Sequence, residues 1–174
     1  SDPSAGAELK SGLSVHSSAR VMRCPSRAPC RYIRLKLFAA DGDSIAQFNT
    51  MFAQDGVMLY VPRNTIVDET IQIVSLIQAN VEMLLNRRML IILEENSKAN
   101  ILLCDHSSQE KQSLSTLVTE VFVGAGASLN IYDIEETANS NTRVATMLVD
   151  QQADSHFNHC CVTLTNGFTR NCIN

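Results

Sequence analysis

The sequence predicts an all-β protein, a parallel β-helix built as a single-stranded solenoid with a short helix near its start. Two observations predict this fold. From residue 81 to the last residue, short apolar runs alternate with polar or Gly-rich turns, and no helix of ordinary length interrupts them. The runs recur with a period of about 27–29 residues, which is typical of a solenoid whose coils bury one another's faces.

The composition is that of one ordinary domain. A chain of 174 residues with 45% apolar content is large enough to bury its own core. A net charge of −4 and the absence of Trp give no reason to expect nucleic acid as a partner. No apolar run approaches the ~18–20 residues of a membrane span. The six cysteines are scattered and follow no signal peptide, so we expect a reducing, cytoplasmic location.

Residues 1–43 differ in composition from the rest. Between Glu8 and Asp41 there is no acidic residue, while half of all Lys and Arg residues lie in this segment. An acid-poor segment rich in Arg and Ser is typical of a transit peptide, but Pro25 and Pro29 would break the amphipathic helix that such a peptide uses. We therefore expect 1–43 to be a poorly ordered basic arm, either a leader or a segment that binds an acidic partner.

Residues 44–53 are predicted to form the helix. Ser44 is placed as the N-cap, and Gln47 three residues later completes a capping box. Three apolar side chains fall on one face of this helix: Ile45, Phe48 and Phe52. Gly56 follows and can take the left-handed conformation of a helix stop. We expect this helix to cover the open edge of the first coil.

The predicted strands come in pairs, each separated by a turn. The first pair is 57–61, closed by Pro62 because proline cannot donate to a ladder, and the β-branched run 71–77. The later pairs are 89–93 with 101–103, 117–123 with 129–134, and 147–149 with 157–164, before a last strand near residue 171. The loop GAGAS at 124–128 lacks the Gly-Lys-Ser/Thr ending of a phosphate-binding loop, so we interpret it as a tight corner.

Four segments carry a resemblance to a known family: FNTMFAQDGVMLYVP at 48–62, NRRMLIILEENSKANILLCDH at 86–106, TLVTEVFVGAGASLNIYDIEET at 116–137 and NGFTRN at 166–171. In this order and spacing, the chain resembles the SufB/SufD family of the Suf iron–sulfur cluster assembly system. The NRR before one strand and the CDH after the next resemble the bacterial SufD type. Residues 1–43 carry no part of this resemblance.

The resemblance implies a right-handed parallel β-helix that acts as a scaffold subunit in the bacterial cytoplasm. Its implied partners are a SufB-like subunit and the ATPase SufC. It implies no enzymatic activity and no tightly bound cofactor. An iron–sulfur cluster would pass transiently through the complex, and the resemblance leaves open whether the complex also carries a flavin. The family's interface histidine and its SufC-binding helical segment would lie beyond Asn174. We therefore transfer no catalytic residue and expect the β-helix domain, 44–174, to be truncated at its C-terminal end.

The densest group of possible metal ligands is His156, His159, Cys160 and Cys161. Because side chains alternate along a strand, His159 and Cys161 share one face, and His156 and Cys160 share the other. A zinc or cluster site needs about four converging ligands, and each face offers two. Neighbouring coils, if stacked in register, could add Cys104, His106 or Cys172. We expect no bound metal, with the cysteines as small buried side chains and the histidines outside.

Carboxylates provide the alternative function, because many parallel β-helices are polysaccharide lyases or hydrolases with acids on an outer face. The available acids are Glu94, Glu95, Asp133, Glu135, Glu136, Asp150 and Asp154. They lie in predicted turns or alternate with apolar residues, and no paired-Asp motif joins them, so we favour the scaffold. Glu120 lies within a predicted strand, where an inward charge is costly. It either faces water or pairs with an arginine: Arg87, Arg88 or Arg143.

The predicted C-terminal strands are largely apolar and uncharged. A terminal coil exposes unpaired backbone N–H and C=O groups unless something covers it. We therefore expect further coils to cover this end in the intact molecule, or a second copy of the chain to pair with it as a homodimer.

Overall fold

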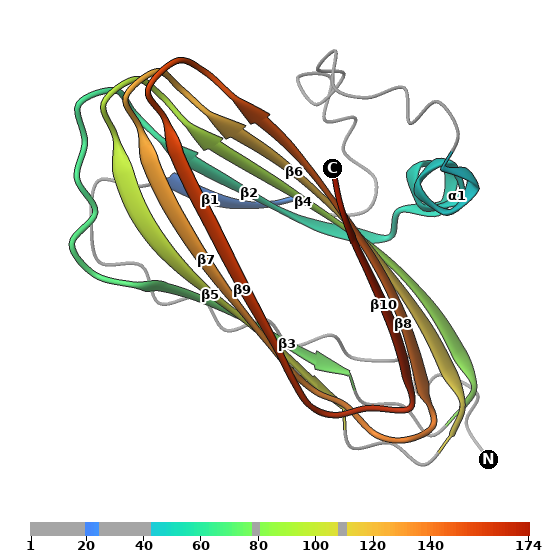
Figure 1. The fold of residues 1–174 in the computed structure, drawn as a ribbon. Helices are drawn as coiled ribbons and strands as arrows, with labels where there is room; N and C mark the ends of the chain where they lie inside the picture. The colour runs from blue at the N-terminus through green and yellow to red at the C-terminus, as the bar shows by residue number, and fades with distance from the viewer. Residues whose placement is uncertain (1–19, 25–42, 78–80, 108–110) are drawn as a thin grey trace.

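Two sheets face each other and form a parallel β-solenoid of about four turns, as the sequence predicts (Figure 1). The computed structural model describes residues 20–24, 43–77, 81–107 and 111–174. Within these ranges the elements are β1 (Arg20–Cys24), α1 (Ser44–Phe52), β2 (Asp55–Val61), β3 (Ile71–Ile77), β4 (Met83–Leu93), β5 (Lys98–Ser107), β6 (Ser113–Val123), β7 (Ser128–Glu136), β8 (Asn141–Gln151), β9 (His156–Thr165) and β10 (Phe168–Ile173). One sheet has the order β1-β2-β4-β6-β8-β10 and the other β3-β5-β7-β9; we call them the six-stranded and four-stranded sheets.

Successive coils stack in register but differ in length. One ladder of aligned residues consists of Leu59, Ile91, Val121 and Val149. The spacing along it falls from 32 to 30 to 28 residues, so only the last step lies within the predicted period. The predicted strands lie inside the observed ones, apart from the last, which begins at Phe168 rather than near residue 171. Most were predicted too short, because one half of each strand carries polar side chains.

We call the interior between the two sheets the lumen. One half of the lumen is apolar and closely packed. Its fully buried side chains include Leu59, Val61, Ile91, Leu93, Val121 and Val123 from the six-stranded sheet and Ala99, Ile101, Leu129 and Ile131 from the four-stranded sheet. Each large aliphatic side chain buried this way stabilises the fold by about 1.5–3 kcal/mol. This half of the lumen supplies most of the driving force for stacking the coils.

The coils turn one corner with the same backbone device. A residue in left-handed backbone lies there in each described coil: Asn64 (φ 56°), Asn96 (φ 54°), Gly126 (φ 66°) and Asp154 (φ 57°). Gly, Asn and Asp adopt this conformation most readily. The corners also hydrogen-bond to each other, since the Gly126 amide donates to the Ala153 carbonyl at 3.0 Å. The loop GAGAS is therefore a tight corner, as predicted.

The first edge of the six-stranded sheet is covered by β1, which pairs antiparallel with β2. This strand lies within the segment 1–43 that the sequence marks as a poorly ordered arm. Apart from β1 and Asp43, the residues of that arm lie outside the described residues. The expectation that the helix covers the open edge of the first coil is wrong. Instead α1 packs on the outer face of the six-stranded sheet against β4 and β6 (Figure 1).

The helix differs from its prediction in cap, face and stop. The N-cap is Asp43, not Ser44, because its carboxylate accepts from the amides of Ile45 and Ala46 at 2.9 and 3.1 Å. The buried residues are Ala46 and Asn49, whereas Phe48 and Phe52 are exposed. The side-chain amide of Asn49 donates to the Arg87 carbonyl at 3.0 Å and to Thr116 Oγ1 at 2.8 Å. Buried hydrogen bonds, rather than an aromatic stripe, thus attach α1 to the sheet.

Gly56 is not a helix stop. It lies within β2, and a Cβ at this position would come within 3.0 Å of the Arg88 carbonyl oxygen on the neighbouring strand. The glycine therefore permits close strand packing. Among the described residues, no helix is long and apolar enough to cross a membrane.

Candidate functional site

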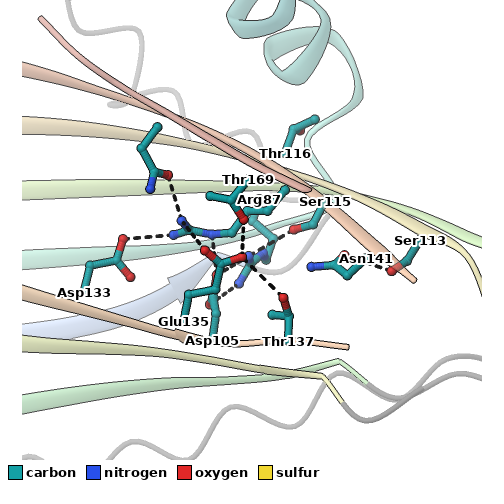
Figure 2. Close-up of polar contacts among 12 residues, drawn as sticks. Arg87, Asp105, Ser113, Ser115, Thr116, Asp133, Glu135, Thr137, Asn141 and Thr169 are labelled. Atoms are coloured by element: carbon teal, nitrogen blue, oxygen red, sulfur yellow. Dashed lines mark hydrogen bonds and ion pairs between the residues drawn. The ribbon is translucent and has the colours of Figure 1, made fainter. Parts of the chain in front are cut away.

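The other half of the lumen is lined by polar and charged side chains, most of them buried (Figure 2). We call this set the polar lumen cluster, and its members are Arg87, Asp105, Ser113, Ser115, Asp133, Glu135, Thr137, Asn141, Arg143, Thr163, Thr169 and Asn171. Strand alternation produces it, because inward positions fall at every second residue on both sheets. Stacking in register then places the members from different coils beside one another.

Arg143 is the centre of the polar lumen cluster. Its guanidinium donates to Asp105 Oδ2 at 3.1 Å, to Asp133 Oδ2 at 3.0 Å and to Asn171 Oδ1 at 2.9 Å. A carboxylate oxygen of Glu135 lies 3.8 Å from Nη1. The side chain is 1% exposed. Burial alone would lower the pKa of Arg143, but the carboxylates raise it above its ordinary value, so the guanidinium stays charged.

Asp105 joins two arginines from different coils. Arg87 binds it through two parallel hydrogen bonds of 2.9 Å, and Arg143 adds a third contact. Burial raises the pKa of the Asp105 carboxyl, but the two guanidinium groups outweigh burial and hold it well below its usual range. Bidentate arginine–carboxylate pairs of this kind fix geometry as well as charge. The three side chains therefore tie together strands β4, β5 and β8.

Glu135 is held mainly by hydroxyl groups. Its carboxylate is fully buried and accepts from Thr137 at 3.3 Å, Thr163 at 3.2 Å and Thr169 at 2.6 Å. Thr163 and Thr169 belong to the last described coil, so this carboxylate fastens that coil to the one before it. Hydrogen bonds to a charged group are the stronger kind, about 1.5–3 kcal/mol each.

The cluster was missed by sequence reasoning, although a signal for it exists. Asp133 and Glu135 alternate in step with Leu129 and Ile131, which are buried, so all four side chains must share the inward face of β7. We had assigned these carboxylates to turns or solvated positions. The alternation, followed strictly through the strand, would have placed both acids in the lumen.

The proposed metal-ligand residues divide between two faces. His159 lines a lumen cavity together with Asp133 and Arg143, and Cys161 accepts from the Asn171 side-chain amide at 3.4 Å. His156 and Cys160 alternate with them. Cys160 and Cys161 are both exposed, so the expectation that the cysteines are buried is wrong for these two. His159 thus faces the lumen. The expectation that the histidines lie on the outer face is wrong for this residue. In the part of the chain that the structure describes, no group of three or more His, Cys, Asp or Glu residues is placed to hold a metal ion.

The electrostatic surroundings of these two lumen residues keep both neutral at pH 7. Burial lowers the pKa of His159, opposed by Asp133 and assisted by Arg143. Burial also raises the pKa of the Cys161 thiol, and the negative charge of Asp133 acts in the same direction. A protonated thiol is a poor nucleophile and a poor metal ligand.

The remaining candidate ligands lie apart from this pair. Cys104 is buried and accepts from the Gln72 side chain at 3.7 Å. His106 lies 3.2 Å from Glu136 in an exposed pair. Cys172 is partly buried on β10, and the cysteines at 104, 160, 161 and 172 are all free thiols.

Glu120 pairs with Arg88, one of the three arginines that the sequence offered. Arg88 Nη2 lies 2.6 Å from its carboxylate, and the Glu120 side chain is only 5% exposed. This pair is on the outer face of the six-stranded sheet, under α1, because Arg88 also donates to Thr50 of the helix. Burial raises the pKa of Glu120 despite the nearby guanidinium. The pair therefore contributes to helix docking and lies outside the lumen.

The C-terminal end of the solenoid is apolar and uncovered in the described residues. β9 and β10 are the last strands of their sheets. Their exposed apolar side chains are Val162, Leu164, Phe168 and Ile173. Unpaired strand edges with exposed apolar side chains are the usual template for association with another chain.

Comparison with known families gives two adjoining matches. Residues 75–174 match the family described as "SUF system FeS cluster assembly, SufBD core domain", and residues 3–73 match "SufBD protein N-terminal region". The second match extends over most of 1–43, where the sequence itself offered no resemblance. No curated protein and no solved structure gives a significant match.

Proposed function

Because the chain belongs to the SufB/SufD family of the SUF system, we propose that it is a scaffold subunit of an iron–sulfur cluster assembly complex. The observation that carries the proposal is the pair of matches, which follow one another along residues 3–174 in the order N-terminal region, then core domain. The cluster itself is cargo in this proposal, held transiently by the assembled complex.

The geometry supports a scaffold in two respects. The lumen is held by aliphatic packing in one half and by ion pairs in the other, and such packing makes a rigid body. The apolar end formed by β9 and β10 offers this rigid body a place for a partner. A rigid body that presents strand edges is better suited to binding other subunits than to catalysing a reaction.

The proposed partners are a SufB-like subunit and the ATPase SufC. The NRR and CDH segments at 86–88 and 104–106 favour the SufD role within the family. Further coils of the same chain, or a second copy of it, are the alternative occupants of the β9–β10 end.

We propose no enzymatic activity for the chain. The carbohydrate-enzyme alternative needs acids free on an outer face, whereas Asp133 and Glu135 are buried and engaged by Arg143 and threonine hydroxyls. Glu94, a partly exposed acid, accepts from the Arg63 backbone amide at 2.9 Å and closes a corner. No contact among the described residues favours the alternative.

Binding to the partner tests the proposal and locates its surface. We expect the chain, co-expressed with the SufB-like and SufC subunits of its own source, to purify with both. Leu164→Glu and Phe168→Glu should each reduce recovery of the SufB-like subunit at least tenfold, because each places a charge in an apolar interface.

Ile66→Glu is the matched control, since Ile66 is equally exposed but lies far from the last coil in the fold. It should leave recovery unchanged. The proposed surface would be contradicted if the SufB-like subunit were recovered equally well with Leu164→Glu, Phe168→Glu and Ile66→Glu. The proposed function would be contradicted if the unmodified chain recovered neither subunit.

A further inference from the structure

We draw no further inference here: the strongest candidate, the exposed apolar side of α1 that Phe48, Met51 and Phe52 form on the outer face of the six-stranded sheet, carries no proposal, because nothing in the described part of the chain shows what covers it.

Discussion

Single buried charges determine how the polar half of the lumen is held together. Arg143 contacts side chains from β5, β7 and β10, so its guanidinium joins three coils. The cost of burying it is offset only while its carboxylate partners are present. The same side chain in an apolar lumen would be destabilising.

Replacing Arg143 with methionine should therefore be severe. Arg143→Met keeps most of the volume but leaves Asp133 unpaired and Asp105 with one arginine, so we expect a loss of about 3–5 kcal/mol in unfolding free energy. Urea denaturation followed by circular dichroism measures it. Arg63→Met removes an exposed arginine that lies 3.7 Å from Glu94 and should change stability by less than about 0.5 kcal/mol. Similar effects for the two variants would show that the buried pairs contribute little.

Asp105 should make stability depend on pH in acid. Its folded pKa lies below the value of about 3.9 for an unfolded aspartate, so its contribution is complete above that pH and is lost as pH falls below it. Glu120 acts in the opposite direction, because burial raises its pKa. We compare urea midpoints between pH 6 and pH 2 for the unmodified chain and Asp105→Asn. The variant should be less stable at pH 6 and lose less stability on acidification.

The control for this pH series is Asp150→Asn, whose carboxylate lies near the end of β8 and accepts from the Gln152 side chain. This variant should follow the unmodified chain through the whole range. An equally steep acid loss in Asp105→Asn would show that other groups control the dependence.

At the scale of single elements, α1 is attached to the sheet by a few specific contacts. Asn49 is fully buried and donates to β4 and β6, while Asp43 both caps the helix and accepts from Thr146 of β8. The aromatic rings of Phe48 and Phe52 contact each other, 5.0 Å apart, and stay exposed. Removing the amide of Asn49 should therefore detach the helix selectively.

We expect Asn49→Ala to cost about 1–3 kcal/mol, since it leaves the buried Arg87 carbonyl and Thr116 hydroxyl without this donor. Hydrogen exchange should show faster amide exchange along α1 while β6 stays protected. Met51→Ala, at an exposed position of the same helix, should leave both stability and exchange unchanged. Uniform acceleration through β6 as well would mean that the helix is integral to the solenoid.

The elements also show how far sequence reasoning reaches. The apolar half of each strand was predictable, because Leu59, Ile91 and Val121 lie in short apolar runs. The polar halves were not found, because hydrophobic patterning stops where Ser115 and Arg143 continue the ladder. The helix was found, but its buried face was misassigned. Asn49 attaches the helix through hydrogen bonds, and the spacing of apolar residues does not reveal them.

At the scale of the whole molecule, the repeat was the decisive signal. A period near 28 residues with strand-length runs left a β-solenoid as the best architecture, and the structure has this fold. The coils shorten along the chain, which obscured the exact period. The partner of Asp133 could not be predicted, because it depends on the register that places Arg143 of β8 beside β7.

The central claim, that this chain is a scaffold of an iron–sulfur assembly complex, is tested most directly by isolating the protein from its native host. The chain, tagged and purified anaerobically, would be analysed by mass spectrometry for the subunits that accompany it. We expect a SufB-like subunit and an ATPase of the SUF system in fixed proportion to the chain. Recovery of the chain without either subunit, together with activity on a polyuronide, would contradict the claim.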